Sequence, residues 1–70
     1  MPRETIDSTV IEAVHYDEAR RHLDVELTNQ RAYRYFDVPP EVYHAFMAAD
    51  SKGRFYNDDI RDEYDYARLR

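Results

Sequence analysis

The stretch His22-Leu23-Asp24-Val25-Glu26-Leu27-Thr28 decides the fold, because polar and apolar side chains alternate along it without a break. Successive side chains of a β-strand point to opposite faces of the sheet, so this pattern predicts that Leu23, Val25 and Leu27 share a buried face. The polar side chains between them would face solvent, as is typical of an antiparallel sheet that is covered on one side. The stretch therefore predicts a half-buried strand of an antiparallel sheet.

Two further strand-like segments flank this stretch. Residues 10–16 are rich in β-branched and aromatic side chains. In this segment Ile11 falls on the opposite parity from Val14 and Tyr16, which indicates either two partly covered faces or a β-bulge that shifts the register. Residues 31–36 form the third segment. Because the links between the three segments are short, a three-stranded antiparallel β-meander is the predicted topology.

Two helical segments are predicted after the sheet. Pro39 and Pro40 end the third strand, since proline cannot donate to a strand ladder but fits the first turn of a helix. The apolar spacing within residues 42–49 predicts an amphipathic helix. Ser51 suits the N-cap of a second segment, which we expect to bend or end near Asn57. The fold class is therefore α+β, with both helical segments packed on one face of the sheet.

Seventy residues allow one domain. We expect a flexible N-terminal arm at residues 1–8, the folded domain at residues 9–66 and a C-terminal tail at residues 67–70. The predicted core consists of the apolar positions that the strands and helices turn inward, namely Val14, Leu23, Val25, Leu27, Val42, Phe46 and Phe55.

The composition narrows the class of protein. The chain has no cysteine, a formal net charge of −5, seven tyrosines, three phenylalanines and no tryptophan. The lack of cysteine excludes disulfides and thiolate metal sites, and it suits a reducing cytoplasm. We find no signal-peptide h-region and no apolar stretch near the roughly 18 residues that a membrane span needs. We therefore expect a cytoplasmic protein with no role at a membrane and no long-range attraction to nucleic acid.

The residues that could carry catalysis are sparse. His15, His22 and His44 have no metal-ligand spacing, although the first two could approach each other across a hairpin. The polar run at residues 57–59 lacks the alternating ligand positions of a calcium loop. A single glycine excludes a glycine-rich phosphate loop. We expect no catalytic residue, no metal and no cofactor, and a small enzyme is the least favoured alternative.

A binding module fits the sequence better, and the first candidate surface lies on the third strand. Tyr33 and Tyr35 are two residues apart, so both project from the same face of the sheet. They either complete the core or form an exposed platform on which bases stack, as in proteins that bind single-stranded RNA. Arg34 projects from the opposite face. The platform would need nearby cations, which Arg31 and Arg34 could supply locally.

The second candidate surface is the start of the second helical segment. It is either an anion site or a capped helix start with solvated charges. Together the two surfaces supply the candidate nucleic-acid-binding residues, Arg31, Tyr33, Arg34, Tyr35, Lys52, Arg54, Asn57 and Arg61. If the partner is RNA, we expect the arginines among them to converge on one face. The alternative is a protein-interaction module that uses exposed tyrosines or a sheet edge.

The order of motifs resembles the KTSC domain family. The resemblance runs from about residue 8 to residue 66 and rests on Ser8-Thr9, Ile11, Val14, Tyr16-Asp17, Leu23-x-Val25-x-Leu27, Tyr33-x-Tyr35, Val38-Pro39, Val42-Tyr43, Ser51-x-Gly53-x-Phe55-Tyr56-Asn57, Ile60-Arg61 and Tyr64.

This resemblance implies a small domain found at the C-terminus of some bacterial lysyl-tRNA synthetases and as free-standing bacterial proteins. It also implies an association with RNA or tRNA, by analogy with the company that the domain keeps. Two departures from the family are visible. Gln30 stands where members commonly have glycine, and residues 58–63 are acidic where relatives are often basic, which argues against an extended phosphate contact.

Overall fold

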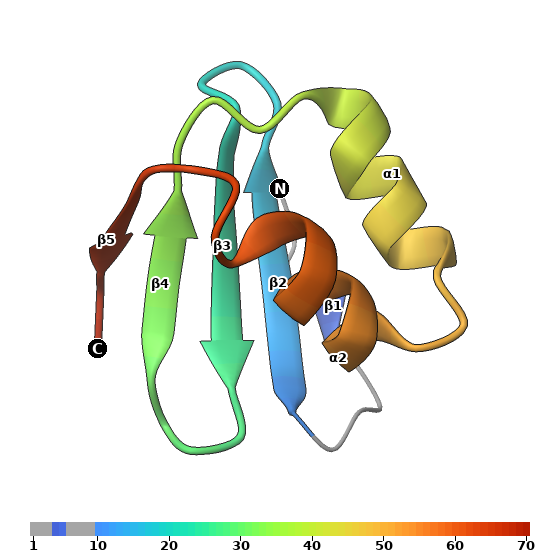
Figure 1. Ribbon diagram of the computed structural model, residues 1–70. Coiled ribbons are helices and arrows are strands. Elements are labelled where there is room, and N and C mark those ends of the chain that lie inside the picture. The colour runs from blue at the N-terminus through green and yellow to red at the C-terminus, as the bar shows by residue number, and fades with distance from the viewer. Residues whose placement is uncertain (1–3, 6–9) are drawn as a thin grey trace.

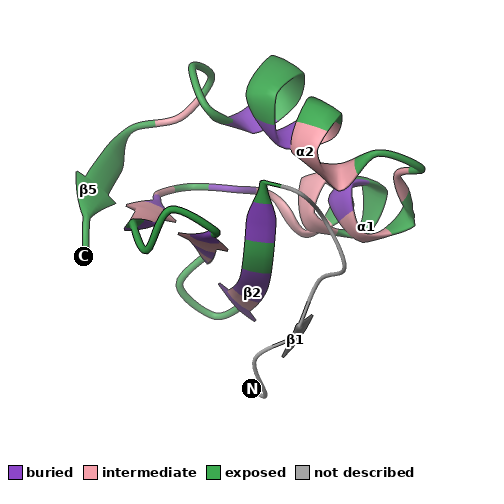
Figure 2. Ribbon diagram, turned by 90° about the horizontal axis from the view of Figure 1, so that it is seen from below, coloured by how far each residue is buried: buried purple, intermediate pink, exposed green. Residues whose placement is uncertain are grey.

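The structure is a computed structural model that describes residues 4–5 and 10–70, and these residues form one antiparallel sheet with helices on one face (Figures 1 and 2). The elements are β1 (Glu4–Thr5), β2 (Ile11–Asp17), β3 (His22–Leu27), β4 (Ala32–Tyr35), α1 (Pro40–Ala48), α2 (Lys52–Phe55), the π-helical turn η1 (Tyr56–Ile60) and β5 (Tyr66–Arg68). The five strands that these residues form lie in the order β1-β2-β3-β4-β5. The predicted α+β class is confirmed, and the predicted meander is the centre of a wider sheet.

The alternation in β3 sets which face of the sheet is buried. Leu23, Val25 and Leu27 are buried, while the polar residues between them are only partly covered. Val14 on β2 is the register partner of Val25, so these two side chains share the covered face. Burial of apolar surface on this face is the main stabilising contribution that a chain of this size can make.

The irregular parity of β2 comes from a β-bulge. Ile11 pairs with Leu27 and Ala13 pairs with Glu26, so Glu12 is an extra residue without a partner on β3. The extra residue restores Ile11 to the covered face, where it is fully buried. Of the two interpretations of the sequence, the bulge is therefore confirmed.

Most of the predicted core is buried, with two corrections. The residues that are buried as expected are Val14, Leu23, Val25, Leu27 and Phe46. Val42 and Phe55 are instead half-buried and pack against the core from its rim.

Phe55 is only half-buried because Phe46 occupies the inner layer of the core. Phe55 stacks on the outside of Phe46, with ring centroids 5.6 Å apart. Tyrosines fill much of the remaining interior. Tyr16 is buried and its hydroxyl donates to the carbonyl oxygen of Val38 at 2.6 Å.

Phe55 and Ile60 are five residues apart, a spacing that does not fit an α-helix, and the geometry of the second helical segment accounts for it. Ser51 caps α2 as predicted, because its side chain accepts a hydrogen bond from the backbone N–H of Arg54. The chain then continues into η1, where the N–H of Arg61 donates to the carbonyl oxygen of Tyr56 at 2.8 Å. This wider turn brings Tyr56 and Ile60 to the buried side, so the expected change of helical geometry near Asn57 is present.

The two chain ends differ from the predicted division. Residues 67–70 are predicted to be a tail, but Tyr66–Arg68 form the edge strand β5 against β4, and Arg70 contacts Glu26. Of the predicted arm at residues 1–8, only Glu4 and Thr5 lie within the described residues, and they pair with β2. None of the described helices is long and apolar enough to cross a bilayer.

Truncating the buried face of β3 should destabilise the fold. A buried side chain that is shortened loses its transfer free energy and leaves a cavity, so we expect Val25→Ala to cost at least about 1–2 kcal/mol and Leu27→Ala about 2–5 kcal/mol. Urea unfolding gives the free energy of each variant. Glu18→Ala, at an exposed turn, should change it by less than about 0.5 kcal/mol. Near-neutral effects at both Val25 and Leu27 would mean that the buried face is assigned incorrectly.

The turn between β3 and β4 contains a residue that is conformationally strained. Gln30 has φ of 71°, in the left-handed region that costs a residue with a Cβ atom about 1–2 kcal/mol. We expect Gln30→Gly to stabilise the protein by up to about 1 kcal/mol, since the gain exceeds the added flexibility of the unfolded chain. Thermal and urea unfolding measure the change. The matched control is Ala19→Gly at a turn position without positive φ, which should destabilise by about 0.4–1 kcal/mol. Equal effects at the two positions would contradict the strain.

Candidate functional site

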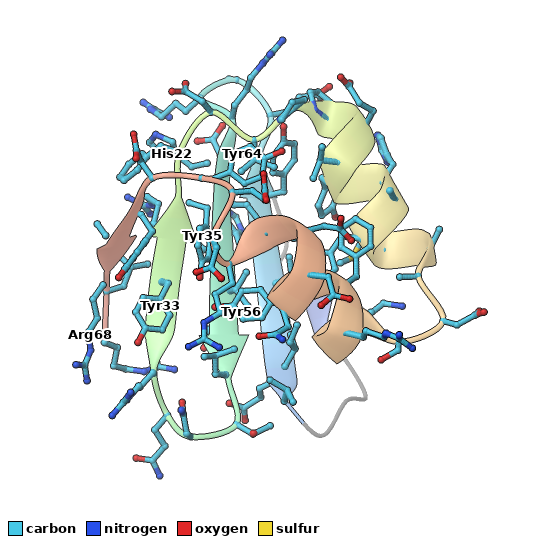
Figure 3. The ribbon with its side chains drawn as sticks, in the orientation of Figure 1. His22, Tyr33, Tyr35, Tyr56, Tyr64 and Arg68 are labelled. Carbon is cyan, nitrogen blue, oxygen red and sulfur yellow. The ribbon has the colours of Figure 1, made fainter. Side chains whose placement is uncertain are left out.

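A cleft of about 560 Å³ lies between the sheet and the helical segment α2–η1. Figure 3 shows Tyr33 and Tyr35 on β4 and Tyr56 on the helical segment. Its walls combine aromatic and cationic side chains. The lining residues are Val10, Leu27, Asn29, Arg31, Tyr33, Tyr35, Gly53, Arg54, Tyr56, Asn57, Arg61, Asp62 and Tyr66.

Six of the eight candidate binding residues line this cleft. They come from two regions far apart in sequence, the third strand with its preceding turn and the second helical segment, and they are Arg31, Tyr33, Tyr35, Arg54, Asn57 and Arg61. The antiparallel pairing of β3 and β4 brings one set to the sheet face, and the Ser51 cap starts the segment that carries the other.

The remaining two candidates, Arg34 and Lys52, lie outside the cleft. Arg34 projects from the opposite face of the sheet, where it makes two hydrogen bonds to the carboxylate of Asp24, at 2.8 and 3.0 Å. The cause is the alternation of β4, which directs Arg34 away from the face of its two tyrosine neighbours. The Lys52 ammonium donates to the carbonyl oxygen of Ala49 at 3.2 Å.

The sequence left open whether the two tyrosines of β4 complete the core or form an exposed platform, and the two residues differ in this respect. Tyr35 is 2% exposed and belongs to the core, whereas Tyr33 is half-buried at the cleft wall. Tyr66 of β5 extends this wall, because its ring packs edge-on against Tyr33 with centroids 5.6 Å apart. Since Tyr66 is 59% exposed, the wall offers an aromatic surface to solvent. The sequence analysis does not include Tyr66 among the candidate residues, because the three exposed residues of β5 show no burial pattern.

A pair of phenols joins the sheet to the helical segment at the cleft. The hydroxyl groups of Tyr35 and Tyr56 are 2.5 Å apart, and either one can be the donor. Burial raises the pKa of both phenols, and the Tyr56 hydroxyl raises that of Tyr35 further. The positive charge of Arg61 partly opposes this rise at both rings. Both phenols are therefore neutral hydrogen-bonding groups at physiological pH.

The arginines of the cleft differ in their partners. The Arg61 guanidinium donates to the side-chain oxygen of Asn57 at 3.1 Å. Arg54 is highly exposed and lies 3.7 Å from Asp58, which makes a weak ion pair. For the Arg31 guanidinium we find no partner within residues 4–5 and 10–70. The lining contains these three arginines and one carboxylate, that of Asp62. The cleft is therefore locally basic, although the chain as a whole is acidic.

Among the described residues, neither the start of α2 nor the polar groups outside the cleft indicate a second anion or metal site. The backbone N–H of Arg54 is satisfied by Ser51, which favours the capped helix start over an anion site there. His22 packs edge-on against Phe36 on the outer face of the sheet. Among the described residues, no group of three or more histidines and carboxylates could hold a metal ion.

Comparison with known proteins identifies the family. The profile of the KTSC domain matches residues 7–64. This chain belongs to the KTSC domain family. The crystal structure of a KTSC domain protein from Yersinia pestis has a TM-score of 0.94 and 30% identity, covering 99% of this chain and 97% of that one.

Relatives of the KTSC domain occur alone and within a larger protein. An uncharacterized protein of Stutzerimonas stutzeri is 37% identical over 70 residues and 99% of both chains. A protein of Tsukamurella paurometabola is 39% identical over 59 residues, which cover 84% of this chain and 88% of that one. A lysine–tRNA ligase of Nostoc punctiforme is 30% identical over 63 residues, which are 90% of this chain but 11% of the ligase.

The phenol pair predicts a loss of stability at alkaline pH. An unfolded tyrosine ionises near pKa 10.0, while burial raises the pKa of Tyr35 and Tyr56 in the folded KTSC domain. Below pH 10 their contribution is fully present, and above it the unfolded state releases protons first, so the free energy of unfolding should fall. Urea unfolding between pH 8 and pH 11 measures this.

The control for this prediction removes both hydroxyls and keeps the rings. The double variant Tyr35→Phe/Tyr56→Phe should show a shallower alkaline decline than the parent chain, whereas Tyr66→Phe, at an exposed ring, should not change the decline. A flat profile in the parent chain, or an equally steep one in the double variant, would contradict the assignment.

Proposed function

We propose that this KTSC domain is a non-enzymatic, RNA-associated binding module of the cytoplasm, and that it holds an unpaired nucleotide in the cleft. The observation that carries the proposal is the combination of an exposed tyrosine wall with three arginines along one cleft. Unpaired bases stack on aromatic side chains, and arginines bind the phosphates beside them. To hold one nucleotide, a module needs an aromatic side chain that reaches its base and an arginine that reaches its phosphate.

The size of the cleft fits this ligand. A volume of about 560 Å³ lies within the range of about 300–1,000 Å³ that is usual for sites of small molecules. It suits one nucleotide better than a long tract. The half-buried ring of Tyr33 and the exposed ring of Tyr66 form the surface on which a base would stack, at about 1–3 kcal/mol per base.

The charge of the chain explains why the cations must be gathered locally. At a net charge of −5 the long-range field repels a polyanion, but at physiological salt that field is screened beyond about 8 Å. Contacts of Arg31, Arg54 and Arg61 act within this distance. The resulting affinity is modest and depends strongly on salt.

The relationship with a lysine–tRNA ligase supports tRNA as the class of RNA. The matching segment is 11% of that ligase, so the similarity covers only a small part of the enzyme. A domain of this family would associate with RNA without a reaction of its own. The absence of cysteine suits the reducing cytoplasm in which tRNA is charged.

A protein-interaction module is the second candidate, and β5 is the observation that favours it. This strand lies at the edge of the sheet, and its three residues are all exposed. An extended peptide could add to this edge as a further strand. Crosslinking and pull-down from the native cell, with RNA and protein both sequenced, separates the two candidates, since a protein partner would persist at moderate salt.

The RNA proposal predicts a specific salt dependence. Each phosphate of a single strand that a cation neutralises contributes about −0.7 to the slope of log Kobs against log salt, so three arginines predict a slope of roughly −2. Arg31→Gln should weaken binding of a short single-stranded RNA and make the slope shallower by about 0.7. Isothermal titration calorimetry at several salt concentrations measures both quantities.

The matched control is Arg20→Gln, which removes the same charge from an exposed turn outside the cleft and should leave the slope unchanged. Failure of the parent chain to bind RNA at low salt would overturn the proposal. Equal losses in Arg31→Gln and Arg20→Gln would assign the binding to overall charge rather than to the cleft.

A further inference from the structure

The hydroxyl pair of Tyr35 and Tyr56 carries one proton more than the pair itself uses. Two phenols have two O–H donors, and the hydrogen bond between them employs one. No carbonyl or carboxylate within the described residues accepts the second proton. The two side chains are only 2% and 5% exposed, and both line the cleft. The pair therefore has a second, neutral O–H donor, on one of two tyrosines that line the cleft.

Positive charge accompanies this donor. Arg61 lines the same cleft as the two phenols, and its positive charge opposes the rise that burial causes in the pKa of both. Arg31 enters from the β3–β4 turn and Arg54 from the opposite wall. Hydrogen bonds to charged acceptors are about twice as strong as neutral ones, and burial strengthens them further. The combination of neutral phenol and guanidinium donors is suited to a compact oxyanion.

We propose, on the basis of the RNA function above, that the cleft binds the terminal phosphate monoester of an RNA strand. The spare phenolic proton of the pair of Tyr35 and Tyr56 donates to one phosphate oxygen. Arg61, with Arg31 and Arg54, neutralises the phosphate charge. The terminal base packs against the tyrosine wall.

The charge of the ligand favours a terminal phosphate over an internal one. A phosphate monoester carries about −1.5 to −2 at pH 7, whereas an internal phosphodiester carries a single charge. The lining of the cleft has three arginines and one aspartate, which leaves a net charge of +2. A phosphate monoester matches this charge, whereas a phosphodiester balances only half of it.

The surroundings of the cleft also favour a strand that ends there. Asp62 follows Arg61 and lines the cleft itself, while Glu63, Asp58 and Asp59 are exposed around it and Asp58 lies 3.7 Å from Arg54. These carboxylates would repel the phosphates of a strand that continued along the helical segment. One phosphate is attracted within the cleft and its neighbours on that side are not, so the favourable position is a chain end.

The test compares three single-stranded RNA oligonucleotides of one sequence, bearing a 5′-phosphate, a 3′-phosphate or hydroxyls at both ends. Isothermal titration calorimetry with the full chain measures each affinity. We expect one phosphorylated end to bind at least about tenfold more tightly than the hydroxyl-ended strand, and the two phosphorylated strands distinguish the 5′ from the 3′ source. A nucleoside monophosphate should compete with the preferred strand.

Two variants locate the preference. Tyr35→Phe/Tyr56→Phe removes both hydroxyls but keeps the rings, and it should reduce the preference for the phosphorylated end about tenfold, the effect of losing a hydrogen bond to a charged group. Arg61→Gln, at an exposed side chain, should reduce it without affecting folding. Tyr64→Phe and Arg20→Gln, both outside the cleft, should retain the full preference.

The outcomes separate this inference from the proposed function. Equal binding of all three strands, lost in Arg31→Gln, would leave RNA binding in place and overturn the terminal-phosphate inference. A preference that survives in both the phenol variant and Arg61→Gln would also overturn it. Binding of none of the strands would overturn the proposed function itself.

Discussion

Burial of one face of a small sheet is the constraint on which the rest of the structure depends. A chain of seventy residues has little apolar surface to bury, and its two short helical segments must cover what the alternation of β3 presents. Tyrosine helps to meet this demand, because it contributes a large apolar ring and a polar group that can reach a partner. Tyr16, Tyr35 and Tyr56 are accordingly buried, and each hydroxyl has a partner.

The same choice of residue creates the candidate site. A core closed by phenylalanine would leave an apolar seam between β4 and the helical segment. The seam closed by Tyr35 and Tyr56 instead carries hydroxyl groups into a cleft, beside Arg61. The contact that stabilises the seam therefore also belongs to the candidate site. The contact between the sheet and η1 also fixes the distance between the two walls of the cleft.

Sequence reasoning was sufficient where a pattern records burial directly. The alternation of β3 and the Ser51 cap each leave a local signal that the structure confirms, whereas the parity change in β2 left two interpretations open until the register placed a bulge at Glu12. It was insufficient where the outcome depends on contacts between distant segments. Tyr66 lies in a three-residue edge strand whose exposed residues show no burial pattern, and the pairing of Arg34 with Asp24 depends on the register between two strands.

The residues that line the cleft come from segments far apart in the sequence, and this affects how a ligand would change the stability of the fold. Arg31 and Tyr33 belong to the hairpin, while Arg54 and Arg61 belong to a helical segment more than twenty residues later, so the cleft exists only in the folded chain. A ligand that bridges these walls binds the native state and not the unfolded one, and it must stabilise the fold in proportion to its occupancy. In a domain with a small core, ligand binding and folding are thus linked through the same phenol contact.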